Sequence, residues 1–215
     1  MAKNTIMVFC AHNDDNILGA GGTIAKYTEE GKEVITVIFS YGEGSHPWFQ
    51  KKVTTAIRVE EAQAAARIIG EKEIIFLGLS DGKLQAETKA AKVQRRLDVL
   101  LKRYKPSRIF THSADELHPD HRAVYGAVLA ALDRTRLKPS VFGFPVWHLF
   151  SIKERKAPKL YVDISSTFSR KLQGLNAHKS QKVAIYTLAV NTYLKGFLNG
   201  LQCESRFAEV FYKLR

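Results

Sequence analysis

Two clusters of histidine and aspartate have the residue types from which metal-dependent hydrolase sites are built. They lie at residues 11–16 and 112–121, about a hundred residues apart in the chain. Two histidines and one carboxylate that leave a coordination position open are typical of a catalytic zinc site. The clusters predict three such ligands: His12, Asp15 and His121.

Other side chains in the same clusters suit acid and base roles. Asp14 could take a proton from the attacking water, whose pKa a nearby cation lowers. His118 precedes His121 by one helical turn, and it could stabilise the oxyanion and protonate the leaving amine. Asp120 could orient or charge one of these two histidines. The positive end of their helix should favour a neutral His121 and oppose a protonated His118.

Each cluster alone also has a commonplace interpretation. A pair of aspartates after a strand often only forms a turn and caps a helix. A His-x-x-His pair on a helix is usually exposed on the surface and binds no metal. Their joint presence after two strands that should flank a crevice favours one shared site instead. His46, His112 and His148 have no such support, and we expect them to be structural or exposed.

Apolar runs alternate with amphipathic segments through most of the chain. This pattern predicts an α/β fold, a three-layer, doubly wound, Rossmann-like and mostly parallel sheet. The expected strands cover residues 5–10, 34–39, 74–79 and 108–111. The expected helices cover residues 17–30, 55–69, 87–104 and 119–134. If the strand order is 3-2-1-4-5, the first and fourth strands are neighbours, and both clusters meet at their carboxyl ends.

The chain beyond Ser140 is less regular. We expect strands at 141–146 and 160–164, and then a helix capped by Ser165 or Ser166. A last helix should pack the C-terminus onto the sheet through a set of apolar residues: Tyr186, Val190, Tyr193, Leu194, Phe197 and Leu201. With 215 residues, of which 45% are hydrophobic, we expect a single domain spanning 1–215.

Cysteine usage and hydropathy bear on the compartment. Cys10 and Cys203 are the two cysteines, and their positions suggest neither a disulfide framework nor a thiolate metal site. We therefore expect a reducing, cytoplasmic environment. The first apolar run is too short for a signal peptide, and no stretch of about 18 apolar residues occurs. The protein should be soluble.

The formal net charge of +12 raises the question of nucleic acid. The lysines and arginines are spread over the chain, without a recognised binding motif or interleaved aromatic residues. We therefore expect no specific nucleic-acid partner. The charge is better suited to attracting an anionic small substrate or a membrane surface. A homo-oligomer is compatible with the sequence.

The chain resembles the LmbE-like or PIG-L de-N-acetylases. Their signatures are Ala-His-Pro-Asp-Asp-Glu after the first strand and a later His-Pro-Asp-His, which is intact here at 118–121. Similarity extends through 41–44, 76–82, 162–164 and 178–181. The resemblance implies zinc, one ion per chain, held by the three ligands above, with Asp14 as general base and His118 as the electrophilic or acid partner.

The same resemblance implies a substrate class and two further site residues. The substrate would be an N-acetylated amino sugar of the N-acetylglucosamine type, or its conjugate, possibly with an anionic aglycone. Arg58 and His178 would contribute to substrate binding. The chain departs from the motif at Asn13, where proline is usual, and at Asn16, where glutamate is usual. Neither is a ligand position, but losing the glutamate could reduce metal affinity or rate.

Three other functions compete with this one. Gly19, Gly21 and Gly22 suggest a dinucleotide-binding domain, but Ile24 stands where the glycine fingerprint needs its last glycine. Glu43 is the only other residue that supports a dinucleotide-binding domain. A magnesium-dependent phosphoryl-transfer enzyme could use the paired aspartates, although the nearby histidines favour zinc. A non-catalytic module that binds nucleotide or nucleic acid remains open if the departures from the motif mark a decayed site.

Overall fold

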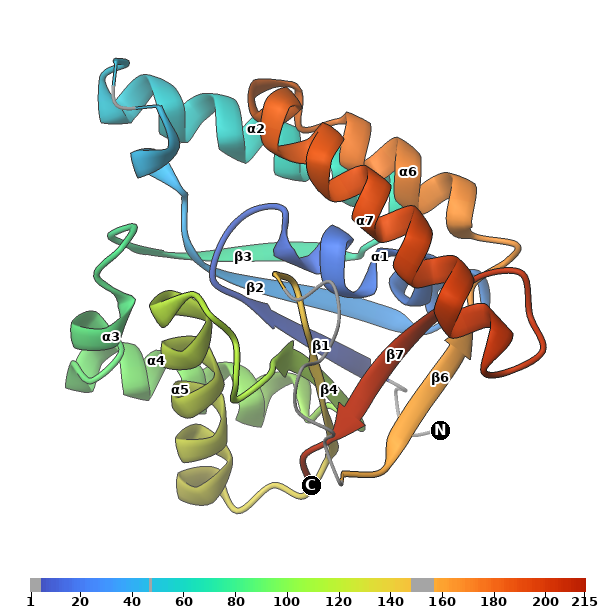
Figure 1. Ribbon diagram of the computed structural model, residues 1–215. Coiled ribbons are helices and arrows are strands. Elements are labelled where there is room, and N and C mark those ends of the chain that lie inside the picture. The colour runs from blue at the N-terminus through green and yellow to red at the C-terminus, as the bar shows by residue number, and fades with distance from the viewer. Residues whose placement is uncertain (1–4, 47, 148–156) are drawn as a thin grey trace.

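A computed structural model describes residues 5–46, 48–147 and 157–215. These residues form a seven-stranded sheet of order β3-β2-β1-β4-β5-β7-β6 (Figure 1). The strands are β1 (Thr5–Cys10), β2 (Glu33–Ser40), β3 (Glu73–Leu79), β4 (Arg108–His112), β5 (Ser140–Phe144), β6 (Lys159–Asp163) and β7 (Ala208–Lys213). Strands β1 to β5 pair in parallel in the order 3-2-1-4-5, which is the condition under which the two clusters were expected to meet.

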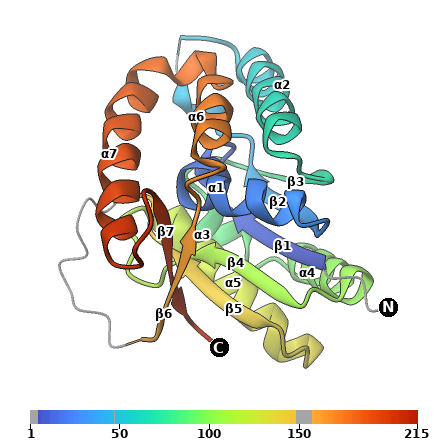
Figure 2. The same cartoon turned by 90° about the vertical axis from the view of Figure 1, so that its right-hand side faces the viewer.

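Helices cover both faces of the sheet, as the three-layer prediction requires (Figure 1, Figure 2). One face carries α1 (Asp15–Glu29), α2 (Lys51–Ile69), α6 (Phe168–Asn176) and α7 (Lys182–Leu201), and the other carries α3 (Leu84–Glu87), α4 (Ala91–Tyr104) and α5 (Pro119–Thr135). Two short 3-10 helices, η1 (Glu43–Ser45) and η2 (Lys179–Gln181), lie in the loops.

The central strand β1 is buried on both sides. Ile6, Val8 and Cys10 pack into the core beneath α1, α2 and α6, whereas Met7 and Phe9 pack into the core beneath α4 and α5. Successive side chains of a strand point to opposite faces, so an uninterrupted apolar run is what a strand covered by helices on both faces needs. This burial fixes the position at which the loop after β1 leaves the sheet.

The glycines of α1 allow that helix to lie close to the sheet. A Cβ atom at Gly19 would lie 2.2 Å from Cδ2 of Phe144, and one at Gly22 would lie 2.6 Å from Cδ1 of Ile164. Any larger residue would push α1 away from β5 and from the end of β6. Packing therefore accounts for these glycines without a bound dinucleotide.

The helix predicted at 87–104 begins four residues later, as α4 at Ala91, and α3 is a separate short helix at Leu84–Glu87. The Thr88 hydroxyl donates a hydrogen bond to the Leu84 carbonyl at 2.7 Å, at the end of α3. Two further boundaries differ from those expected. The strand predicted at 141–146 ends at Phe144 because Pro145 has no N–H to donate. Thr167, rather than Ser165 or Ser166, precedes the first residue of α6.

The C-terminal segment differs most from the prediction. Strand β7 was not expected, and it inserts between β5 and β6 with antiparallel pairing to both. The expectation that α7 packs its large apolar residues onto the sheet is wrong for Val190, Leu194, Phe197 and Leu201, which are exposed. Tyr193 is also 47% exposed, but its ring packs edge-on against Phe168 and Phe207. The side chain of Tyr186 lies outside the described part. The strand β7, and not the apolar stripe of α7, joins the C-terminus to the sheet.

Both cysteines are free thiols, with Cys10 buried in the core. Among the described residues, no helix combines the length and hydrophobicity that crossing a membrane requires.

Candidate metal centre and active site

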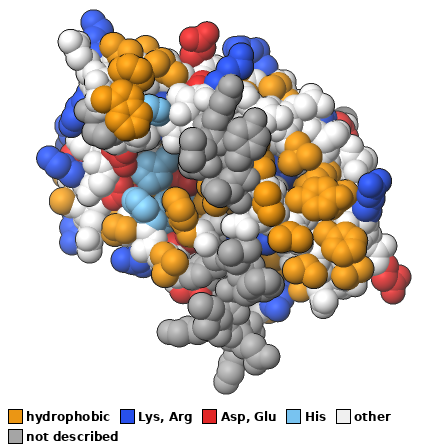
Figure 3. All heavy atoms as spheres, turned by 45° about the horizontal axis from the view of Figure 1, so that its top comes forward, with side chains coloured by type: hydrophobic (Ala, Val, Ile, Leu, Met, Phe, Trp, Pro, Cys, Tyr) orange, Lys and Arg blue, Asp and Glu red, His pale blue; other side chains and the backbone are white. Residues whose placement is uncertain are grey.

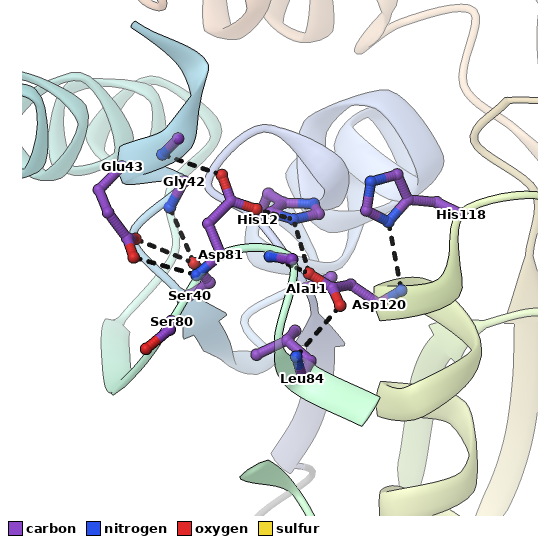
Figure 4. Close-up of polar contacts among 12 residues, drawn as sticks. Ala11, His12, Ser40, Gly42, Glu43, Ser80, Asp81, Leu84, His118 and Asp120 are labelled. Atoms are coloured by element: carbon purple, nitrogen blue, oxygen red, sulfur yellow. Dashed lines mark hydrogen bonds and ion pairs between the residues drawn. The ribbon is translucent and has the colours of Figure 1, made fainter. Parts of the chain in front are cut away.

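The two sequence clusters meet at the carboxyl ends of β1 and β4. Helix α1 begins at Asp15, directly after the loop that follows β1, and α5 begins at Pro119 after the loop that follows β4. Since β1 and β4 are paired neighbours, the two loops lie side by side, with His12 facing His118 and Asp120 (Figure 4). The sheet order thus brings together residues about a hundred positions apart.

His12, Asp15 and His121 form a set that could hold one metal ion, because their ligand atoms all lie within 4.8 Å of one another. Nε2 of His121 is 3.3 Å from Oδ1 of Asp15, and Nδ1 of His12 is 3.5 Å from Oδ2 of Asp15. The His121 Nε2 atom is buried and has no hydrogen-bond partner. A buried ring nitrogen without a partner needs an explanation, and a cation bound at this point would supply one.

A second possible set shares His12 and consists of His12, His118 and Asp120. Its carboxylate is already engaged, because Asp120 accepts hydrogen bonds from the backbone N–H of Gly82 at 2.8 Å and of Leu84 at 3.1 Å (Figure 4). Nδ1 of His118 accepts the backbone N–H of Asp120 at 3.2 Å. Asp15 of the first set accepts one backbone N–H, from His12 at 2.7 Å, through Oδ2 alone, and its Oδ1 faces His121. Both oxygens of Asp120 are occupied by backbone donors, so the first set is the better candidate.

Two carboxylates support the outer nitrogens of the candidate ligands. Oε2 of Glu116 lies 3.0 Å from Nδ1 of His121, and Oδ1 of Asp81 lies 3.1 Å from Nε2 of His12. Such partners fix the orientation of a ligating imidazole and raise its basicity. Sequence reasoning assigned no role to Glu116 and met Asp81 only within a similar segment. The sequence signal for Glu116 would have been its position, because it is a carboxylate five residues before His121.

The electrostatics of the set centre on Asp15. Burial raises the pKa of Asp15, but His121 and His112 outweigh it and hold this pKa well below its usual range. Burial also disfavours the charged form of His121 and so lowers its pKa, but Asp15 and Glu116 together raise this pKa to about 9. The expectation that the helix terminus keeps His121 neutral is therefore wrong, because the two carboxylates decide its charge. A cation between these groups would replace that proton.

The Asp120 carboxylate faces a different histidine from the two that it was predicted to orient. Its Oδ2 atom is 3.6 Å from Nε2 of His12, so its carboxylate faces the histidine of the other cluster. It contacts His118 through its backbone N–H. Burial, together with His12 and His121, lowers the pKa of His118, which is the expected direction although the cause is not the helix terminus.

Of the histidines expected to be structural or exposed, His112 is fully buried. Its Nε2 atom accepts the backbone N–H of Ala11 at 3.0 Å, and its ring stacks on His121 with centroids 3.9 Å apart. Burial and His121 lower the pKa of His112 to about 4, so it is neutral. His46 is half-buried, with Nε2 3.0 Å from the Ser180 carbonyl. His148 lies outside the described residues.

Asp14 precedes α1 but does not cap it. Its side chain makes no capping hydrogen bond, and its Oδ1 atom lies 3.6 Å from a terminal nitrogen of Arg58. The Arg58 side chain is buried, and its carbonyl accepts a hydrogen bond from the Asn13 amide at 2.9 Å. The Asp14 carboxylate is thus free of helix capping, and Asn13, which replaces the usual proline, ties the loop to α2.

His178 lies close to the same carboxylate. It is 1% exposed, and both of its ring nitrogens lack a hydrogen-bond partner. Burial lowers the pKa of His178, with Asp14 opposing and Arg58 reinforcing that shift. Glu61, which could have paired with Arg58 within α2, instead accepts two hydrogen bonds from Ser180, at 2.6 and 2.7 Å. The fold therefore brings Asp14, Arg58 and His178 together.

The second departure from the family motif, Asn16, has a compensating neighbour. The Asn16 amide donates to Oε1 of Glu71 at 3.0 Å, and the Thr36 hydroxyl donates to the same atom at 2.5 Å. Burial raises the pKa of Glu71 to about 7 against the effect of these two bonds. A carboxyl group therefore lies beside position 16, contributed by the loop after α2 and not by the motif itself.

The surface view shows where this site reaches solvent. Histidine side chains come to the surface in one place, next to acidic side chains, and hydrophobic side chains lie on either side (Figure 3). His12 keeps 14% of its side chain exposed, whereas Asp15 and His121 are buried beneath it. A small molecule could reach the candidate metal position from this opening.

Comparison with known proteins agrees with this geometry. The family model described as PIG-L, GlcNAc-PI de-N-acetylase, matches residues 7–132. A probable N-acetyl-alpha-D-glucosaminyl L-malate deacetylase 2 from Bacillus cereus is 31% identical over 196 residues, which cover 86% of each chain. The chain therefore belongs to the PIG-L family of de-N-acetylases.

Two further proteins are similar to this chain. The 4-oxalmesaconate hydratase of Pseudomonas putida is 25% identical over 197 residues, covering 84% of this chain and 75% of that protein. The N,N'-diacetylchitobiose deacetylase from Pyrococcus horikoshii, solved with an inhibitor, has the same fold, with a TM-score of 0.78 and 22% identity over 98% of this chain and 84% of that one. One of these two similar proteins is thus named a deacetylase and the other a hydratase.

Proposed function

We propose that the chain is a zinc-dependent hydrolase that removes the acetyl group from an N-acetylated amino sugar of the N-acetylglucosamine type, or from its conjugate. One observation carries the proposal: in the set of His12, Asp15 and His121, Nε2 of His121 is buried without a hydrogen-bond partner, and the carboxylate of the adjacent residue Asp14 is not used for helix capping. We infer a cytoplasmic location because both cysteines are free.

His12, Asp15 and His121 would hold one zinc ion per chain, since two imidazoles and a carboxylate are a common catalytic set for this metal. A bound zinc ion lowers the pKa of water and polarises a carbonyl group. Glu116 and Asp81 would keep the two imidazoles in place through their outer nitrogens.

Asp14 would act as the general base. It would take a proton from the water that attacks the acetyl carbonyl carbon, while Arg58 holds its carboxylate in position. The proton that Asp14 accepts is then available for the nitrogen that leaves when the C–N bond breaks. The products are acetate and a free amine.

His118 would stabilise the developing oxyanion. Because its Nδ1 atom accepts the Asp120 N–H, its neutral form carries its proton on Nε2, the nitrogen that remains free to donate. Its lowered pKa favours this hydrogen-bonding role over that of a charged proton donor. Asp120 would position His12 and the loop that begins α3.

Arg58 and His178 would bind the sugar. His178 brings two unpartnered ring nitrogens close to Asp14, and sugar hydroxyl groups can both donate to and accept from such atoms. Buried polar atoms of this kind are costly unless a ligand satisfies them. The two residues would therefore orient the acetamido group relative to Asp14.

The test is acetate release from a panel of N-acetylglucosamine, diacetylchitobiose and N-acetylglucosaminyl malate, with zinc-depleted and zinc-restored protein. We expect acetate from at least one sugar, with activity that is lost on depletion and returns with zinc. Zinc-loaded protein that releases no acetate from any of them would contradict the proposal. Hydration of an unsaturated acid by that same protein would then point to the chemistry of the hydratase relative.

Substitution of the two adjacent aspartates separates catalysis from metal binding. Asp14→Asn keeps the shape but cannot accept the proton, so the rate should fall by roughly a hundredfold or more while zinc content stays near that of the unmodified chain. Asp15→Asn should lose zinc. Zinc content is measured by elemental analysis and rate by acetate release. If Asp14→Asn remained fully active, or lost zinc as completely as Asp15→Asn, the two roles would be wrongly assigned.

A further inference from the structure

Helix α7 carries a stripe of large apolar side chains that face solvent. Six residues make up this stripe, each between 43% and 61% exposed: Val190, Tyr193, Leu194, Phe197, Leu198 and Leu201. Tyr193 also packs its ring against Phe168 and Phe207, at the inner edge of the stripe. Their spacing of three and four positions places them on one face of the helix over three turns. Half of the large hydrophobic side chains exposed in the described part of the chain lie on this single element. Figure 3 shows hydrophobic side chains gathered over this region.

The opposite face of α7 carries small residues that are buried: Thr192, Gly196 and Gly200. A Cβ atom at Gly200 would lie 2.5 Å from the Ser205 carbonyl oxygen, and one at Gly196 would lie 3.2 Å from Cε2 of Phe168. No larger side chain fits at Gly200, where the neighbour is backbone, and at Gly196 the Phe168 ring would have to shift. Sterics therefore fix the rotation of the helix, and the stripe cannot turn inward.

The stripe is also free of charge. In a chain of net charge +12, Lys195 is the only charged residue among positions 188–203. It points away from the stripe, donating to the Val146 carbonyl at 3.3 Å, and burial lowers its pKa to about 8. Helices that lie on membranes present lysine and arginine beside their apolar face, and none do so here. Two copies of a strongly basic chain repel each other less at an uncharged face than at a basic one.

The size of the stripe suits a pair of identical copies. Aromatic and aliphatic side chains of roughly 150–250 Å², about half exposed, give on the order of 500 Å² per copy and about 1,000 Å² for two. That is near the lower limit for a specific interface, and it reaches the upper range of patches left open on monomers. A stripe along one straight helix can pack against its own copy around a two-fold axis.

We propose that this stripe is the interface of a symmetric dimer, in which α7 packs against α7 of a second copy. The proposal is independent of the deacetylase activity. The partner of the stripe is a second copy of this chain. The stripe provides only apolar contacts and has no charged group that could select a different protein.

Analytical ultracentrifugation of the full chain tests this proposal. We expect the unmodified protein to sediment as a dimer at micromolar concentration and the double variant Leu194→Glu, Phe197→Glu to sediment as a monomer. Val99→Glu is the matched control, because Val99 is 62% exposed on α4, away from the stripe. This control should remain a dimer. Circular dichroism and zinc content establish that each variant is folded.

A milder variant covers the case in which two glutamates prevent folding. Leu194→Ala, Phe197→Ala should raise the dimer dissociation constant by roughly tenfold or more, since central apolar anchors contribute most to such interfaces. A monomeric unmodified protein at about 100 µM would overturn the proposal, as would a folded stripe variant that remains fully dimeric. Monomeric protein that co-sediments with vesicles of anionic lipid would assign the stripe to a membrane surface instead.

Discussion

At the scale of single residues, the site divides its carboxylates by what each one touches. Asp15 faces the ring nitrogens of His12 and His121, whereas Asp14, its neighbour in sequence, faces Arg58. Helix α1 begins at this pair, so adjacent side chains leave the backbone in different directions. Two identical residue types thus obtain different environments, which is what separate roles on the metal and on the water require.

Glu116 gives a test at this scale that is independent of Asp14. The carboxylate holds Nδ1 of His121 and also accepts the Val146 N–H at 2.8 Å. Glu116→Gln keeps an acceptor but removes the charge, so zinc affinity should fall by roughly tenfold, and Glu116→Ala should fall further within the 10–100-fold range for such partners. Competition with a fluorescent zinc chelator measures the dissociation constant.

Asp98→Asn is the control for this prediction. Asp98 pairs with Arg134 at 2.8 Å on the surface of α4 and α5, far along the helices from the ligand set. Its removal should leave zinc affinity unchanged. Unaltered affinity in both Glu116 variants would mean that His121 is held by its surroundings alone.

At the scale of elements, Glu71 couples the loop after α2 to α1 and β2. Its folded pKa of about 7 lies above the ordinary 4.5 because burial disfavours the charge. A raised carboxyl pKa means that the folded state binds the proton more tightly than the unfolded state does. The stabilisation from Glu71 is therefore complete below about pH 4.5 and is lost as the pH rises through about 7.

Glu71→Gln should accordingly become more stable relative to the unmodified chain as the pH rises from about 5 to 8. The glutamine still accepts hydrogen bonds from Asn16 and Thr36, but it carries no charge to bury. The free energy of unfolding should shift in its favour by up to about 3 kcal/mol across this range. Urea denaturation at several pH values measures the difference.

Glu87→Gln serves as the control, because a backbone hydrogen bond from Ser80 lowers the pKa of Glu87. Glu87 is ionised in both states above pH 5, so its contribution should stay constant over the same range. A Glu71→Gln difference that did not change with pH would indicate that Glu71 is ionised without cost in the folded protein.

At the scale of the whole molecule, the net charge of +12 should influence which substrates arrive fastest. Substrates with a carboxylate or phosphate on the aglycone should show higher kcat/KM than the neutral monosaccharide, because long-range attraction raises the association rate. The preference should shrink as salt is added, since the screening length falls to about 8 Å at physiological ionic strength. Acetate-release kinetics in low and high salt measure it. Equal kcat/KM for charged and neutral substrates at low salt would leave the charge without a role in substrate choice.

The sequence by itself determined the parallel part of the fold and which two loops meet at its carboxyl edge. Runs such as Thr5–Cys10 have an apolar pattern that suits only a strand covered on both faces, and helical periodicity marks the segments between the strands. The order of the first five strands then places 11–16 beside 112–121. These inferences succeed because each depends on a local pattern or on a general rule of winding.

Only the tertiary structure decided which groups support those residues and which face of α7 is covered. Glu116 and Asp81 contact the candidate ligands His121 and His12 through chain geometry that no spacing rule predicts, and Glu71 reaches Asn16 from a loop 55 residues away. Strand β7 carries the buried Glu209, which is neutralised by Lys171 at 2.5 Å across the sheet and helix layers. On α7, apolar periodicity marks a face but not its partner. The close approach at Gly200 turns that face outward, and such contacts between distant segments have no signature in the local sequence.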